Sequence, residues 1–256
     1  MMDFLSDVWF TFARRFRIGL REPVWIFFSL AQPLIWLLLF TQLFKNLALM
    51  PGFPTSEYLL FFAPGLIVMM AVFSSAYTGF DMLQDIQFGV VDKMLITPAN
   101  RYSLIIGNIL NALASLTIQI LIIFIMVYIM GVSVTTGAGG IILTLVIVWL
   151  IGLAFCSLSY ALIIATRSQT ALVVIANLLS LPLMFLSSAM MPAELTPDWV
   201  QTTMNFNPVN YAVEAVRPLF VGGYDWSSYG MGVLVLGIFA AVGVMTAVLA
   251  FRNFGK

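Results

Sequence analysis

The chain has 256 residues, of which 62% are hydrophobic and only 9% are charged, and its 11 basic and 11 acidic residues cancel. A soluble protein of this composition would lack the polar residues needed to cover its core, so a soluble fold is excluded. The balanced charge gives no indication of nucleic acid, and no nucleic-acid partner is predicted. The absence of histidine removes the commonest metal ligand and the usual general base.

The first 22 residues precede the apolar part of the chain. Phe4, Val8, Phe12 and Phe16 recur at helical spacing, whereas Arg14 and Arg15 fall on other faces. This pattern predicts an amphipathic interfacial helix on the cytoplasmic leaflet, with its arginines near anionic headgroups. Two interpretations stay open: a topology anchor alone, or also a contact for a cytoplasmic partner.

Six apolar segments are each long enough to cross a bilayer, whose core of about 30 Å needs roughly 20 helical residues. Within lipid such segments must be helical, because an unpaired strand would leave its backbone polar groups unsatisfied. The predicted fold is an all-α membrane protein, one domain over residues 1–256. Its six transmembrane helices are predicted at 23–44, 58–80, 104–130, 139–165, 170–191 and 229–251.

The positive charges set the predicted orientation. Two basic residues, Lys45 and Arg217, fall on one side, and nine fall on the other: Arg14, Arg15, Arg17, Arg21, Lys93, Arg101, Arg167, Arg252 and Lys256. Because Lys and Arg accumulate in cytoplasmic loops, both termini are predicted to be cytoplasmic.

The cytoplasmic segment 79–101 carries an unusual pattern for a connector. Phe88, Val91 and Leu95 form an apolar stripe beside Asp92, and Asp85 lies one turn before it. A short helix with one apolar face at a membrane surface favours lipid or a protein groove. A solvated connector is the alternative.

The outer segment 192–227 joins the fifth and sixth spans. Thr196 and Asn207 each stand before a proline, a pattern that predicts two short helices. Glu214 and Arg217 are spaced for an i, i+3 ion pair on the second helix. Apolar helices too short to span favour a re-entrant hairpin in the outer leaflet, with an external cap on the bilayer as the alternative.

Little in the spans suggests catalysis or ion coupling. They hold almost no charge between their ends, which argues against a proton- or sodium-driven pump. No phosphate loop of the form G-x-x-x-x-G-K-[ST] occurs, and the single Cys156 allows no intrachain disulfide. Uncharged polar residues line up in spans two, three and five, including Asn108 and Asn177. Hydrogen bonding between helices is the ordinary explanation, and a path for an amphiphile is the alternative.

Two stretches carry a resemblance to a known family. In NPVNYAVEAVR at 207–217, Pro208, Tyr211 and Arg217 fit a C-terminal signature, with Val209 a departure. The cytoplasmic order acid, glycine, acid, hydrophobic residue, proline is matched by Asp85, Gly89, Asp92, Leu95 and Pro98, with Val90 a departure. With six spans and the interfacial helix, the whole chain resembles the type-2 ATP-binding-cassette (ABC) permeases of the drug-resistance, nodulation-factor and polysaccharide-export branch.

That resemblance implies a half-transporter. Two copies of the chain would form a homodimer in a bacterial or archaeal cytoplasmic (inner) membrane, with two copies of a separate ATPase subunit. The ATPase would bind ATP and Mg²⁺, so this chain would bind no cofactor and would not itself be an enzyme. The exported substrate would be an amphiphile such as a drug, a lipid or a lipid-linked glycan.

The resemblance also assigns roles to residues. ATPase coupling would fall to Asp85, Phe88, Gly89, Val91, Asp92, Leu95 and Pro98. The substrate path would include Ser74, Tyr77, Asn177, Ser180 and Met184. The outer hairpin would depend on Pro208, Tyr211, Glu214 and Arg217.

Two other classes of function are weighed against this one. A channel or secondary carrier predicts buried charges or a symmetric repeat, and neither is visible in the sequence. A membrane scaffold without transport activity would not need a coupling-type cytoplasmic helix.

Overall fold

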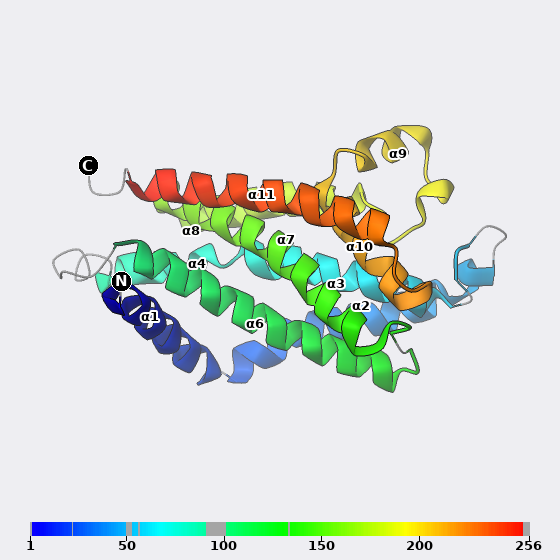
Figure 1. Cartoon of the computed structure of the whole chain (residues 1–256), viewed down its shortest axis with the longest axis horizontal. Helices are drawn as coiled ribbons and strands as arrows, with labels where there is room; N and C mark the ends of the chain where they lie inside the picture. Colours follow the sequence, from blue (N-terminus) through cyan, green and yellow to red (C-terminus); the bar gives the residue numbers. More distant parts are fainter. Residues whose placement is uncertain are drawn as a thin grey trace.

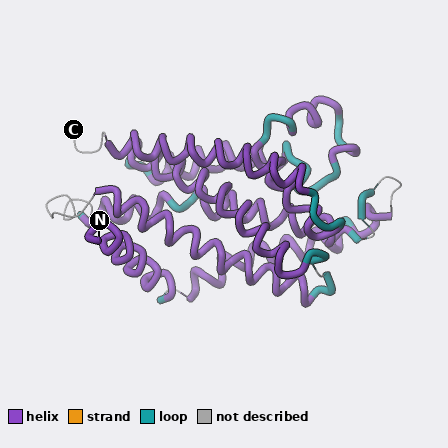
Figure 2. The backbone as a smooth tube through the Cα atoms, viewed as in Figure 1, coloured by secondary structure: helices purple, strands orange, loops and turns teal. Residues whose placement is uncertain are grey.

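The computed structural model describes residues 2–21, 23–49, 53–55, 57–90, 101–132 and 134–252, and the regular structure in these ranges is entirely helical (Figures 1 and 2). The long helices are α1 Met2–Leu20, α2 Pro23–Leu43, α3 Tyr58–Ala76, α6 Arg101–Ile129, α7 Gly137–Thr166, α8 Gln169–Phe185 and α11 Trp226–Arg252. The shorter elements are η1 Lys45–Leu49, α4 Gly79–Gln87, η2 Ala193–Leu195, α9 Asp198–Met204 and α10 Pro208–Val221.

Four helical segments are long and apolar enough to cross a membrane: Tyr58–Gln87, Ser103–Ile129, Gly137–Thr166 and Trp226–Arg252. They correspond to the predicted second, third, fourth and sixth spans. At the first predicted span, the part of α2 whose side chains the structure describes is Ala31–Leu43, and at the fifth α8 is Gln169–Phe185; both are shorter apolar helices. The described residues therefore support four of the six predicted spans by length and composition.

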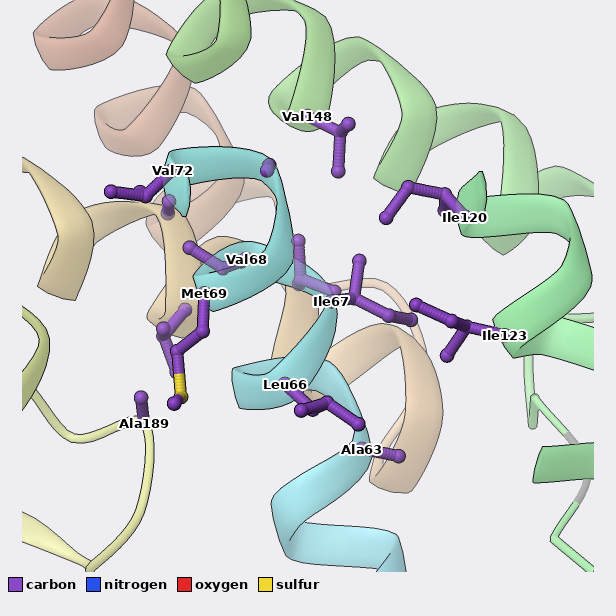
Figure 3. Packing of buried hydrophobic residues seen from close by; sticks show 14 of the residues in the cluster. Ala63, Leu66, Ile67, Val68, Met69, Val72, Ile120, Ile123, Val148 and Ala189 are labelled. Atoms are coloured by element: carbon purple, nitrogen blue, oxygen red, sulfur yellow. The ribbon is translucent and has the colours of Figure 1, made fainter. Parts of the chain in front are cut away.

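The helices lie roughly along the long axis of the molecule, with α7 near the centre of the bundle (Figure 1). Helix α7 packs against α11, α3, α10, α4, α6 and α8. Helix α3 is buried along most of its length, and Figure 3 shows the core that forms around it. In this core Ile67 and Val68 of α3 lie among Ile120 of α6 and Val148 of α7, each fully or almost fully buried.

Helix α1 confirms the predicted N-terminal helix, but the face that it packs against the protein is partly polar, which the sequence did not predict. Its buried residues are Val8, Thr11 and Arg15, whereas Leu5 and Trp9 are more than half exposed. The packed face meets α6 and carries the polar residues Thr11 and Arg15 beside Val8, while Leu5, Trp9 and Phe10 are exposed. Apolar residues that point outward suit a helix in contact with lipid.

The outer segment 192–227 forms the two predicted short helices. Asn207 is the N-cap of α10, its side chain accepting a hydrogen bond from Val209 N, and Pro208 is the first helical residue. Helix α9 begins one residue later than predicted, with Pro197 at the N-cap. Helix α10 packs against α3, α7 and α11, whereas α9 projects from the bundle (Figure 1).

Candidate functional site

A cluster of charged side chains joins three helices at the end of the molecule where α1, α4 and α6 meet. Asp85 on α4 accepts hydrogen bonds from Arg14 Nη2 at 3.0 and 3.1 Å and forms an ion pair with Arg15 Nη2 at 2.8 Å. Asn108 Nδ2 on α6 donates to the same carboxylate at 3.3 Å. Arg15 also donates to the carbonyl of Asp81, whose carboxylate lies 3.8 Å from Arg15 Nη1. We call these five residues the cytoplasmic cluster, after the side of the membrane predicted for segment 79–101.

Two of the charges in the cytoplasmic cluster are almost completely removed from water. The side chains of Arg15 and Asp85 are 6% and 3% exposed, whereas that of Arg14 is 38% exposed. A buried carboxylate is tolerated only when it is paired and hydrogen-bonded, and Asp85 has donors from three side chains. The cluster therefore fixes α4 against α1 and α6.

The sequence predicted Asp85 to act at the ATPase contact, and the structure places it inside the chain instead of on the surface. The one-turn spacing of Asp81 and Asp85 was visible in the sequence, but their pairing with α1 was not. The residue that does reach the surface is Phe88, which is 75% exposed at the end of α4. Gly89 follows with φ of +65°, a conformation that glycine adopts without strain. The other coupling candidates, Val91, Asp92, Leu95 and Pro98, lie outside the described residues.

At the opposite end of the molecule, the side chain of Asn207 caps both the end of α8 and the start of α10. Asn207 Nδ2 donates to the carbonyls of Leu183 and Leu186, both at 2.6 Å, while its Oδ1 accepts from Val209 N at 2.9 Å. The terminal carbonyls of a helix need partners from outside it. Asn207 supplies them for α8, which ends at Phe185 and not at residue 191 as predicted.

Residues 186–190, which we call the outer turn after the side of the membrane predicted for this end of the chain, are held by two more side chains of α10. Asn210 Oδ1 accepts from Ser188 N at 2.9 Å. Arg217 donates to both the hydroxyl and the carbonyl of Ser188, and its guanidinium carbon lies 3.9 Å from the centre of the Phe61 ring. On the other side, Tyr58 donates its hydroxyl to Met190 O at 2.9 Å. Asn207, Asn210 and Arg217 thus fasten the end of α8 between α10 and α3.

The predicted ion pair between Glu214 and Arg217 does not form, so that expectation was wrong. Glu214 is exposed and accepts a hydrogen bond from Asn210 Nδ2 at 2.8 Å. Arg217 points instead to Ser188 and Phe61 because the outer turn offers a carbonyl and an aromatic face. Tyr211, also part of the signature, donates to Asn205 O at 2.8 Å and so ties α10 to the end of α9.

Glu214 and Arg217 nevertheless line the same surface pocket of about 340 Å³, together with Pro54 and Thr55. A second, larger hollow of about 540 Å³ lies between α1, α6 and α7. Its lining is apolar except at Thr117, which accepts a hydrogen bond from Trp149 Nε1 at 2.8 Å. Among the described residues, no group of three His, Cys, Asp or Glu side chains could hold a metal ion.

The structure brings two of the five substrate-path candidates into contact. Tyr77 at the end of α3 donates its hydroxyl to Asn177 Oδ1 of α8 at 2.9 Å. Ser180 and Met184 are buried on the packed face of α8, at 1% and 2% exposure, and Ser74 is half-buried. Within one copy, the Tyr77–Asn177 bond acts as the interhelical hydrogen bond that was the ordinary explanation for these polar residues.

Comparison with known proteins finds relatives that match most of the chain. The chain is 27% identical over 219 residues to the ycf38 protein of Cyanophora paradoxa, which is named a transport permease, and this covers 85% of the chain and 75% of that protein. It is 25% identical over 231 residues to the daunorubicin resistance ABC transporter permease protein DrrB1 of Streptomyces coeruleorubidus, covering 90% and 81%. It is 25% identical over 204 residues to nodulation protein J of Rhizobium leguminosarum bv. trifolii, covering 75% and 72%.

The profile of one protein family extends over most of the chain. That family is the ABC-2 type transporter family, and it matches residues 6–221. The matched region begins within α1 and ends at the last residue of α10, so it contains both the cytoplasmic cluster and the α10 residues that hold the outer turn. The chain belongs to the ABC-2 type transporter family.

Proposed function

We propose that this chain is the permease subunit of an ATP-driven exporter that moves an amphiphile out of the cytoplasm. The family membership supports a membrane subunit of an ABC transporter. The relative named for daunorubicin resistance supports an amphiphilic substrate. Both termini lie in the cytoplasm of a bacterial or archaeal cell in this proposal, and ATP and Mg²⁺ bind to a separate ATPase.

The observation that carries the proposal is the anchored α4 with its exposed end. Met82, Leu83 and Asp85 of α4 are buried, whereas Phe88 at its end is 75% exposed. An aromatic residue held outward on a fixed helix suits insertion into a groove of a partner protein. In the proposed complex, Phe88, Val91 and Leu95 enter the ATPase, and Asp92 meets donors at the rim of the groove.

The experiment is reconstitution with an ABC ATPase that co-purifies with the wild-type chain, using daunorubicin and a fluorescent phosphatidylethanolamine as probe amphiphiles. A Val91→Asp, Leu95→Asp double variant should lose ATPase co-purification and ATP-driven movement, because buried apolar side chains contribute about 1.5–3 kcal/mol each. Thr202→Asp adds a negative charge to exposed α9 and is the matched control.

The possible outcomes separate the classes of function. Normal ATPase binding and turnover in the double variant would refute the coupling role of this segment. Movement of a probe driven by a proton or sodium gradient alone would favour a secondary carrier. Wild-type protein that binds no ATPase and moves neither probe would favour a scaffold.

We also propose that two copies meet along α8. Val174, Leu178, Leu181 and Phe185 are exposed at helical spacing, on the side of α8 away from buried Ser180 and Met184. Pairing at this face would place spans two and five, with Tyr77 and Asn177, beside the dimer axis.

A cross-linking experiment tests this arrangement. Leu178→Cys in a Cys156→Ala background should cross-link two copies. Leu234→Cys, at a comparably exposed site on α11, should not. Equal cross-linking at both positions would contradict this arrangement.

A further inference from the structure

The predicted second span is interrupted where it leaves the core. Helix α3 ends at Ala76 and α4 begins at Gly79, with Tyr77 and Thr78 between them. The turn is closed by short-range hydrogen bonds, from Thr78 N to Ser75 O at 3.3 Å and from Phe80 N to Tyr77 O at 3.1 Å. An interruption in a helix frees backbone groups that must find partners elsewhere when they are buried.

One hydroxyl on another helix satisfies both sides of the interruption. Ser159 Oγ of α7 donates to Ala76 O at 2.7 Å and accepts from Gly79 N at 2.9 Å. Ser159 is 5% exposed, so water does not compete for these bonds. A side chain without a hydroxyl at this position would leave a buried carbonyl and a buried N–H group unpaired.

Close packing also fixes the interruption against α7. A Cβ atom on Gly79 would lie 2.7 Å from Ser159 Oγ and 2.8 Å from the Ser159 carbonyl oxygen. Backbone atoms of α7 cannot move aside as the end of a flexible side chain can. The approach of the two helices at this point therefore requires glycine at position 79.

The interruption separates two sets of contacts with different proposed roles. Where α3 ends, Tyr77 of the turn itself bonds to Asn177 of α8, a substrate-path candidate. Beyond the turn, α4 carries Asp81 and Asp85 of the cytoplasmic cluster and ends at exposed Phe88. A movement of α4 relative to α3 must pass through the turn that Ser159 holds.

We propose that the Tyr77–Thr78 turn is the joint that carries movement of α4 to the Tyr77–Asn177 contact, and that Ser159 is the positioning residue of this joint. The inference rests on the proposed function, because it assigns Ser159 a part in coupling ATP hydrolysis to transport. Ser159 touches no substrate; it acts by holding Ala76 and Gly79 at a fixed separation.

The first test compares Ser159→Ala with Ser157→Ala in the complete complex. Ser157 is a buried serine on the same helix whose hydroxyl has no hydrogen-bond partner in the described part of the chain, so it is a matched control. Hydrogen exchange should be roughly tenfold faster at the Gly79 amide in Ser159→Ala, because a buried N–H group loses its partner. Movement of the probe amphiphile per ATP hydrolysed should fall severalfold, with ATPase binding unchanged.

A second pair of variants tests the close contact between Gly79 and Ser159 by adding a Cβ atom at position 79. Gly79→Ala should lower transport per ATP in the same way, whereas Gly237→Ala, where a Cβ meets open space on α11, should not. This pair keeps the test decisive even if Ser159→Ala lowers the amount of protein in the membrane.

The results that would overturn the joint are distinct from those that would overturn the proposed function. Equal exchange and equal transport per ATP in the Ser159→Ala and Ser157→Ala variants would overturn the joint alone. So would a parallel loss of transport and hydrolysis at a constant ratio, which indicates a purely structural residue. Wild-type protein that binds no ATPase and moves neither probe would overturn the exporter proposal, and with it the coupling role of Ser159.

Discussion

Arg15 of α1 and Asp85 of α4 form an ion pair of 2.8 Å whose two side chains are 6% and 3% exposed. The helix that precedes the predicted spans is thereby fixed to the segment that leaves the second span. The pair also explains why the polar face of α1 turns inward, since Arg15 has its partner inside the protein.

Removing the Arg15 side chain should lower the stability of the folded protein. Arg15→Ala leaves the buried Asp85 carboxylate with one charged donor fewer, and breaking such a pair typically costs about 3–5 kcal/mol. Arg17→Ala, on the exposed face of the same helix, should change stability by less than about 0.5 kcal/mol. Thermal unfolding of the purified protein in detergent measures both. Equal midpoints for the two variants would show that the pair contributes nothing.

Arg217→Ala should destabilise the outer turn whether or not Glu214 is present. Its hydrogen bonds to Ser188 are charge-assisted and worth about 1.5–3 kcal/mol. Because Glu214 does not pair with Arg217, Glu214→Ala should add its own small effect and should not rescue the arginine variant. A double variant more stable than Arg217→Ala alone would show that the two charges are coupled.

Gly65→Ala tests the contact between α3 and the outer turn. A Cβ atom at position 65 would lie 2.8 and 2.9 Å from the carbonyl carbon and Cα of Ala189, and closer still to its oxygen. Overpacking against backbone atoms should cost about 1–3 kcal/mol. Gly237→Ala meets open space and should be neutral or slightly stabilising, since alanine is the better helix former. The unfolding midpoints of the two variants give the comparison.

The start of α11 should weaken in acid. Asp225 accepts hydrogen bonds from Ser228 Oγ and from the backbone N–H groups of Ser227 and Ser228, and these bonds lower the pKa of its carboxyl. A carboxyl whose pKa is lower in the folded state stabilises the protein above its unfolded pKa. That contribution disappears as the pH falls through the folded pKa.

Asp225→Asn keeps a side-chain oxygen that can accept these hydrogen bonds, but its amide does not lose or gain a proton in this pH range. The difference in unfolding midpoint between wild type and this variant should therefore be constant near neutral pH and should shrink in acid. A difference that stays constant from neutral pH down to acid would contradict the role of the charge.

The pattern of apolar residues was enough to predict the class of fold and most of the helices. Runs of apolar residues longer than a bilayer core predict helices, and the structure has them at residues 58–87, 103–129, 137–166 and 226–252. Local capping chemistry also sufficed for α10, because Asn207-Pro208 and Gly222 define its ends from neighbouring residues. The order of acid, glycine and proline residues carried the resemblance to the family that the match over residues 6–221 then showed.

The partners of the polar side chains depend on how the helices pack, and the sequence did not predict them. Asp85 pairs with Arg15, Ser159 bridges Ala76 and Gly79, and Arg217 binds Ser188 and not its sequence neighbour Glu214. Spacing along a helix limits which residues share a face, but it carries no information on which distant backbone carbonyl or carboxylate that face will meet. Buried polar groups bond to whichever partner packing brings within reach, so these contacts followed from helix packing and not from local pattern.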